Sequence, residues 1–127
     1  MRKGLFHNLA VITALASGSK SDAADGIEID RKGSQGLMFA VNAGAITGAG
    51  DFGVKVQESD TSGTGYTDAD ADDVISGVPA TLVANTAYQV EYIGKKRFVR
   101  LAITKTGGTS IQMGAVAIIG HEHIRLP

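Results

Sequence analysis

Two histidines and a glutamate near the C-terminal end of the sequence are spaced as metal ligands could be. In an extended segment, residues two apart share a face, so His121 and His123, on either side of Glu122, would point the same way. The remaining histidine, His7, lies far away in the sequence. The pattern also differs from the helical H-E-x-x-H motif of metalloproteases, whose histidines lie one turn apart. We therefore expect an exposed polar tail here, with no metal.

Four aspartates form a second group. Asp68, Asp70 and Asp72, with Asp73 beside them, resemble the first ligands of an EF-hand calcium loop. That loop needs glycine at its sixth position and glutamate at its twelfth, where this chain has Asp73 and Pro79. We expect a solvated acidic loop, and a weak cation site is the alternative both here and at the histidine pair.

Residues 48–53, Gly-Ala-Gly-Asp-Phe-Gly, match the G-x-G-x-x-G pattern of dinucleotide-binding loops. That pattern binds phosphates only between a strand and a helix, because the helix N-terminus supplies the N–H groups. Here the alternating segment Val54-Lys55-Val56 follows, which is typical of a strand. The sequence therefore predicts a glycine-rich connection between strands and no cofactor.

Other arrangements for catalysis are missing from the sequence. There is no G-x-S-x-G nucleophile elbow, and the absence of cysteine excludes a thiol nucleophile, disulfides and thiolate metal sites. No pair of carboxylates stands out as an acid and a base. We expect a protein that is not an enzyme, with no catalytic residues, no cofactor and no small-molecule substrate.

The composition indicates one small β domain over residues 1–127. The chain has a formal net charge of −1, which argues against nucleic acid as a partner, and 17 glycines but only two prolines, which favours many tight turns. No apolar run approaches the ~20 residues of a membrane-spanning helix, so we expect no membrane partner. Residues 1–16 imitate a signal peptide, but polar residues interrupt the apolar part. We expect residues 1–25 to form a first strand or an N-terminal arm.

Alternating apolar residues predict strands through most of the chain. In the first strand, Leu9, Val11, Thr13 and Leu15 would share one face, and Ala10, Ile12 and Ala14 the other. Further strands are expected at 26–31, 37–43, 52–57, 87–93, 97–105 and 110–119. Residues 60–76 look like a long loop with one short element near 73–76, and Asn85-Thr86 looks like a turn.

These segments favour an all-β fold, an antiparallel β-sandwich of about eight strands, with the jelly roll as one candidate topology. Gly94 to Lys96 and the pair Gly107-Gly108 look like hairpin turns. They predict an antiparallel three-stranded meander over residues 87–119.

Two features indicate a protein–protein contact. Residues 110–119 are apolar on both faces, which is typical of a covered strand or of a subunit interface. Residues 56–94 contain seven acidic side chains and no basic one, whereas residues 95–105 contain five basic side chains and no acidic one. Such separation of charge steers association between subunits. The candidate contact residues are Lys95, Lys96, Arg97, Arg100, Met113, Val116 and Ile118.

Three segments also carry a family resemblance: residues 88–101 (YQVEYIGKKRFVRL), 56–60 (VQESD), and 117–121 (AIIGH) with the closing proline. Together they resemble a family of small virion structural proteins of tailed bacteriophages, often encoded near the major capsid protein. The resemblance covers roughly residues 36–127.

The resemblance implies a capsid decoration (cement) protein on the outside of the virion, made in the cytoplasm of the bacterial host. Its implied partners are the major capsid protein and sister copies of itself, as a homo-oligomer. The alternatives are a tail, neck or stopper protein, or a β-sandwich that binds carbohydrate or a cell surface. The last needs exposed aromatic rings, and of Tyr66, Tyr88 and Tyr92 two look like core residues.

Overall fold

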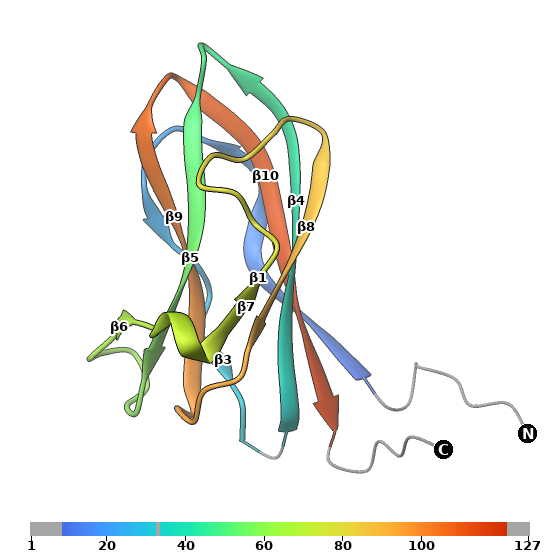
Figure 1. Cartoon of the computed structure of the whole chain (residues 1–127), viewed down its shortest axis with the longest axis vertical. Helices are drawn as coiled ribbons and strands as arrows, with labels where there is room; N and C mark the ends of the chain where they lie inside the picture. The colour runs from blue at the N-terminus through green and yellow to red at the C-terminus, as the bar shows by residue number, and fades with distance from the viewer. Residues whose placement is uncertain (1–8, 33, 122–127) are drawn as a thin grey trace, which may run out of the picture.

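The computed structural model describes residues 9–32 and 34–121, and this part of the chain forms ten β-strands, one short 3-10 helix and no α-helix (Figure 1). Sheet A contains, in spatial order, β1 (Leu9–Lys20), β10 (Ser110–His121), β4 (Ser34–Thr47), β8 (Thr86–Tyr92) and β7 (Val74–Ser76). Sheet B contains β2 (Ala24–Asp25), β9 (Phe98–Gly107), β5 (Asp51–Ser59) and β6 (Thr67–Asp68), and β3 (Ile29–Asp30) also pairs with β9. The short helix, η1, spans Ala71–Asp73.

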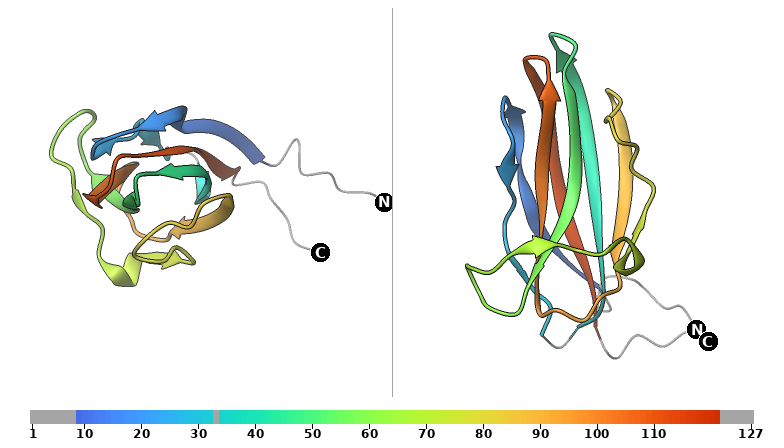
Figure 2. Two further views of the ribbon diagram at one scale, coloured as in Figure 1. Left: turned by 90° about the horizontal axis from the view of Figure 1, so that it is seen from above. Right: turned by 60° about the vertical axis from the view of Figure 1, so that its left-hand side comes forward.

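The two antiparallel sheets pack face to face, which confirms the predicted β-sandwich (Figure 2). Among the described strands, six connections cross from one sheet to the other: β1 to β2, β3 to β4, β4 to β5, β6 to β7, β8 to β9 and β9 to β10. The resulting orders, β1-β10-β4-β8 and β2-β9-β5-β6, are those of a jelly roll. The expected strand-poor segment at 60–76 contains only β6, η1 and β7.

The predicted meander over residues 87–119 is wrong. Strand β8 pairs with β4 and β7, β9 pairs with β5, and β10 lies between β1 and β4. Gly107 and Gly108 therefore form a crossing between sheets and not a hairpin turn, as do the residues around Gly94. Alternation shows that a segment is a strand, but its partner depends on which apolar faces must meet in the core.

The crossing at Gly108 packs tightly against the crossing between β4 and β5. Gly108 has φ of 84°, and a Cβ atom there would lie 2.2 Å from the Cα atom of Gly50. Glycine is thus required for close approach of two backbones as well as for the turn. No helix follows residues 48–53 in the structure, so the glycines there form the predicted connection between strands.

Strand β1 does not alternate along its whole length as expected. Its pairing with β10 is regular from Leu9 to Thr13 and then shifts between Thr13 and Leu15. Both Ala14 and Leu15 are buried, although alternation would place them on opposite faces. A β-bulge causes this, because an extra residue turns the following side chains around.

The expected strand at 26–31 is replaced by the short strands β2 and β3 with a link between them. The N–H of Gly26 donates to the carbonyl of Leu101 on β9 at 2.6 Å, and the N–H of Ile27 donates to the carbonyl of Ala14 on β1 at 2.7 Å. This link thus connects one sheet to the other and closes one side of the sandwich.

The core lies between the inward faces of the long strands. Its largest fully buried side chains are Tyr92, Phe39, Phe52, Ile29, Leu37, Leu82, Leu101, Ile111, Val41 and Val99. Burial of this apolar area drives the sheets together. Asn85 has φ of 57°, in agreement with the predicted turn before β8.

Candidate interaction surface

The outer face of sheet B is polar. Arg100 on β9, Gln57 on β5 and Asp68 on β6 lie side by side across the register, and Lys55 pairs with Asp68 at 3.1 Å. Nε of Arg100 donates to the side-chain oxygen of Gln57 at 2.9 Å. These side chains satisfy one another, as is typical of a solvated sheet face.

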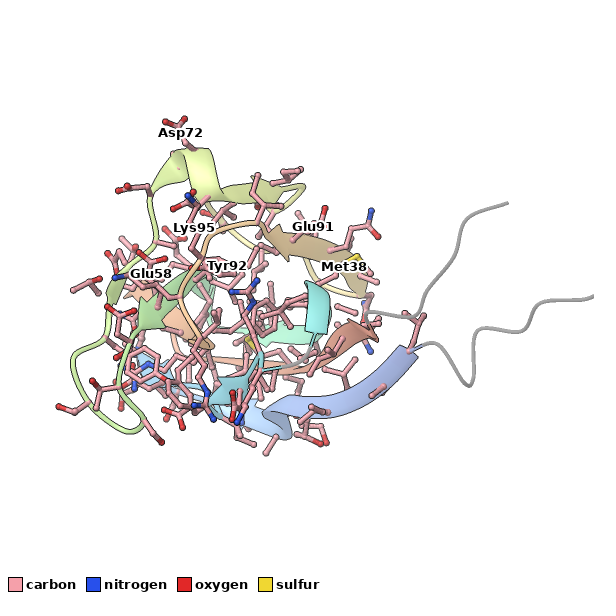
Figure 3. All side chains as sticks on the ribbon, turned by 90° about the horizontal axis from the view of Figure 1, so that it is seen from below. Met38, Glu58, Asp72, Glu91, Tyr92 and Lys95 are labelled. Atoms are coloured by element: carbon pink, nitrogen blue, oxygen red, sulfur yellow. The ribbon has the colours of Figure 1, made fainter. Side chains whose placement is uncertain are left out.

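The outer face of sheet A is apolar by comparison. The register aligns one residue from each strand into a row: Val11, Ile118, Met38, Glu91 and Ile75. Figure 3 shows Met38 and Glu91 on adjacent strands at the rim of the molecule. Val11 is 66% exposed and Ile75 is 59% exposed, so both ends of the row are open to solvent.

A second row runs beside the first and contains Thr13, Val116, Ala40 and Gln89. Next to it is an open hollow of about 390 Å³, lined in part by Thr13, Ala40, Ala87, Gly114 and Val116. The polar side chains of Ser17 and Asn42 line the other part of this hollow. We call Val11, Thr13, Met38, Ala40, Val116 and Ile118 the apolar face.

An antiparallel sheet that meets only water normally carries polar residues on its outer side. The apolar face breaks that pattern on three adjacent strands, β1, β10 and β4, whereas sheet B follows it. Contiguous exposed apolar area marks interaction sites. The two sheets therefore differ in their outer faces: sheet B is polar, and sheet A carries exposed Val11 beside the half-buried side chains of Met38, Val116 and Ile118.

The seven residues expected to form a contact lie in different places. Val116 and Ile118 belong to the apolar face, but Met113 is buried in the core, with 3% of its surface exposed. Arg100 lies on the outer face of sheet B. Lys95, Lys96 and Arg97 lie at the crossing between β8 and β9, at the lower end of the sandwich, where Figure 3 labels Lys95.

Four of the five basic residues at 95–105 are paired with acidic residues of the same chain. Their ion pairs are Lys96 with Asp60 at 2.7 Å, Arg97 with Asp30 at 2.8 Å, Arg100 with Asp25 at 3.4 Å and Lys105 with Asp22 at 3.8 Å. Lys95 is exposed and forms no ion pair within residues 9–32 and 34–121. The separation of charge along the sequence is thus largely cancelled by folding.

Of these ion pairs, the one between Arg97 and Asp30 has the hydrogen-bond geometry that gives the strongest interaction. Nε and one terminal nitrogen of Arg97 each donate to a different carboxylate oxygen at 2.8 Å, a bidentate arrangement. The hydrogen bond from Arg97, followed by the one from the backbone N–H of Lys32, lowers the pKa of Asp30 to about 2. The carboxylate is therefore ionised over the whole physiological range.

The acidic segment is more open. Asp68 pairs with Lys55, whereas Asp72 points away from the body of the molecule on η1 (Figure 3). No group of three or more acidic or histidine side chains able to hold a metal occurs among the described residues. His7, Glu122 and His123, and the side chain of His121, lie outside the part of the chain that the structure describes.

Tyr66 and Tyr92 contact other side chains, whereas the Tyr88 hydroxyl accepts the backbone N–H of Val83. Tyr92 is buried, and its ring lies under the guanidinium of Arg31 at 4.9 Å. The Tyr66 hydroxyl donates to Glu28 at 2.6 Å, and the Arg100 guanidinium lies 4.0 Å from the centre of its ring. Burial, and then the bond to Glu28, raise the pKa of Tyr66 above its ordinary value.

Met38 and Ala40 were missed by the sequence prediction of contact residues. They alternate with Leu37, Phe39 and Val41, so β4 is apolar on both faces, as β10 is. The same two-sided pattern that indicated Val116 and Ile118 could therefore have identified them.

No family model and no curated protein matches this sequence. Among solved structures, the CBM22-1–GH10 modules of Clostridium thermocellum endo-1,4-beta-D-xylanase 10B, crystallised with xylohexaose, show similarity with a TM-score of 0.49 and 13% identity. The match covers 96% of this chain and 28% of that one, so the chain spans under a third of that protein's length. No helix in the described part of this chain is long and apolar enough to cross a membrane.

Proposed function

We propose that this protein is a capsid decoration protein of a tailed bacteriophage, which binds the assembled shell of the major capsid protein through the apolar face. The observation that carries the proposal is the contrast between the two outer faces: sheet B is polar and self-satisfied, and sheet A presents Val116, Ile118 and Met38. The family resemblance of residues 36–127 supplies the partner.

The fold is compatible with this role without deciding it. Jelly rolls occur in viral capsid proteins and in lectins alike, so function has to be argued from the surface. A decoration protein acts by adding contacts to an assembled lattice, and many copies multiply a modest interaction. Such a role is structural and requires neither catalysis nor a cofactor.

The apolar face, rather than the basic segment, is the better candidate for the shell contact. Lys96 and Arg97 are already paired with Asp60 and Asp30, so a partner carboxylate would have to displace an internal one. Val116 and Ile118 need no such exchange. Burying these two side chains against a partner would contribute a favourable free energy of about 25 cal/mol for each Å² of apolar surface removed from water.

Co-sedimentation with purified shells of the phage's major capsid protein tests the proposal. Val116→Lys and Ile118→Lys should each weaken binding by at least about tenfold, because a lysine must lose water inside the contact. The matched control is Val83→Lys, at a 57% exposed position outside both sheets, and it should bind normally. Equal binding by all three variants would overturn the use of this face.

The position of the protein in purified virions tests the partner. Electron microscopy and quantitative mass spectrometry should find many copies spread over the shell. A single ring of copies at one vertex would overturn the capsid role in favour of the tail or neck. Absence from the particle would overturn every virion role, and a glycan array would then test the carbohydrate-binding alternative.

A further inference from the structure

Strand β1 has a free edge over Leu9–Thr13. Among the strands of residues 9–32 and 34–121, β10 alone pairs with β1, so the other side of β1 is an edge of sheet A as described. Further along β1, the carbonyl of Ala14 accepts the N–H of Ile27, and the carbonyl of Ala16 accepts a hydrogen bond from Nζ of Lys20. Apart from the hydrogen bonds between β1 and β10, no backbone hydrogen bond to Leu9–Thr13 is formed by the described residues.

The free edge is apolar on both faces. Val11 belongs to the outer face and is 66% exposed, whereas Ile12 lies on the inner side of the sheet and is still 38% exposed. Figure 2 shows the reason: the first half of β1 extends past the region that sheet B covers. A strand added at this edge would lie beside Val11 on the outer face and beside Ile12 on the inner face.

Natural edge strands normally carry a device against pairing, such as a charge, a proline or a bulge. Residues 9–19 contain neither a charged residue nor a proline. The bulges of β1 begin only after Thr13, and the register with β10 is regular from Leu9↔Gly120 to Thr13↔Val116. The segment is thus a regular, unprotected strand of a kind that folded proteins usually avoid.

We infer that Leu9–Thr13 pairs antiparallel with the same segment of a second copy, which joins two A sheets across a two-fold axis. The incoming strand must be apolar on both faces, and β1 itself meets that condition. Pairing about Val11 places Val11 opposite Val11, Ala10 opposite Ile12 and Leu9 opposite Thr13, so each larger side chain of the last two pairs meets a smaller one. A two-fold interface is self-complementary in this way.

The dimer is expected to be weak in free solution. Five paired residues bury far less than the ~800 Å² per partner of a standard stable interface, so we expect a Kd above about 10 μM. On a shell, copies held side by side would pair at a high effective concentration. Joining the sheets would also make the apolar faces of two copies continuous through Val11.

The absence of cysteine from the sequence makes the inference directly testable. Val11→Cys places single thiols opposite each other at the axis, where directly opposed Cβ atoms lie about 4.5–5.5 Å apart. Under mild oxidation of the free full chain, disulfide-linked dimers should form at least about tenfold faster than for Val83→Cys, because pairing raises the local thiol concentration. Val83 is a matched control, with 57% exposure against 66% for Val11.

Sedimentation equilibrium gives a second measurement without cross-linking. The unmodified chain and Val83→Lys should show concentration-dependent dimerisation, and Val11→Lys should stay monomeric because two like charges would face each other. Circular dichroism should show that all variants are folded, since Val11 and Val83 lie outside the core.

Equal cross-linking of the two cysteine variants, or a chain that stays monomeric up to about 1 mM, would overturn the inference. Shell binding does not enter either measurement. Failure of the dimer and failure of the proposed capsid role are therefore distinguishable.

Discussion

The hydroxyl of Tyr92 on β8 donates a hydrogen bond of 2.6 Å to the carboxylate of Glu58 on β5, and so joins sheet A to sheet B. The same hydroxyl accepts the N–H of Lys96 at 3.1 Å. Figure 3 shows Tyr92 and Glu58 together at the lower end of the sandwich. This one side chain thus fixes both the separation of the sheets and the crossing between β8 and β9.

Removing the Tyr92 hydroxyl should weaken the fold. We expect Tyr92→Phe to lower the free energy of unfolding by about 2 kcal/mol, because a bond to a charged group is lost and its partners stay half-buried. Denaturant titration measures the change. Tyr88→Phe on the same strand is the control and should cost less, because the Tyr88 hydroxyl accepts a hydrogen bond from the N–H of the exposed Val83 and so contacts a neutral, solvated group.

High pH should lower the stability of the fold through Tyr92. Burial first, and then the bond to Glu58, raise the pKa of Tyr92 from 10.0 to about 12. The neutral phenol is thus favoured in the folded state, so its contribution to stability is complete below pH 10 and is lost between pH 10 and 12. Because the pKa of Tyr66 is raised as well, absorbance titration of tyrosinate is best done on a Tyr66→Phe variant, which should show one tyrosine, Tyr92, titrating near pH 12. In Glu58→Gln that midpoint should fall but stay above 10, since burial remains.

Low pH should lower the stability of the fold through Asp30. Its pKa of about 2 lies below the ordinary value of 3.8, so its contribution to stability is present above pH 3.8 and is lost as the pH falls towards 2. NMR titration of the carboxyl carbon measures the midpoint. Arg97→Gln should raise it towards the ordinary value, and Lys95→Gln should leave it unchanged, which separates the bidentate contact from general charge.

Charge reversal at Lys96 or Arg97 should lower the stability of the fold itself. A loss of partner binding in these variants would therefore not show that the two side chains contact the partner. Lys96→Glu faces Asp60 and Arg97→Glu faces Asp30, so each change replaces an attraction by a repulsion. Thermal melts should show a lower Tm for both, with a smaller decrease at high salt because exposed charges are screened. Lys95→Glu should melt as the unmodified chain does. A double reversal that leaves the Tm unchanged would contradict the ion pairs.

A methyl group at Gly26 should destabilise the link between the sheets. The added Cβ would lie 2.5 Å from the carbonyl oxygen of Leu101 and 2.7 Å from that of Ala14. Because both are backbone atoms in paired strands, we expect Gly26→Ala to cost about 2 kcal/mol or more. Gly36→Ala, where no heavy atom lies within 4 Å, should be neutral. Equal stability of the two variants would contradict this packing.

Local patterns were sufficient to place most of the long strands. Segments at 37–43, 52–57 and 110–119 lie within strands of the structure, and the segment at 97–105 does so from Phe98 onward, because alternation of apolar residues reflects which side chains can reach the core. Partner strands could not be predicted in the same way. The pairing of β1 with β10 joins the two ends of the described chain, and no local pattern encodes it.

The candidate surface was predictable only in part. Two-sided apolar character correctly marked β10 as unusual, but it did not show which of its faces is inward, so Met113 was grouped with Val116 although the two lie on opposite faces. The acidic partners of Lys96 and Arg97 are 36 and 67 residues away in the sequence. An excess of basic residues in one segment therefore said little about the charge of the folded surface.

The position of β10 between β1 and β4 in sheet A has a consequence for biosynthesis. Strands β1 and β4 are not neighbours, and β10, the last described strand to leave the ribosome, lies between them. Until it emerges, β1 lacks its partner in the sheet, and its unpaired apolar edges are exposed to other nascent chains. The fold is thus completed after translation of residue 121, in a step that depends on the slow pairing of distant segments.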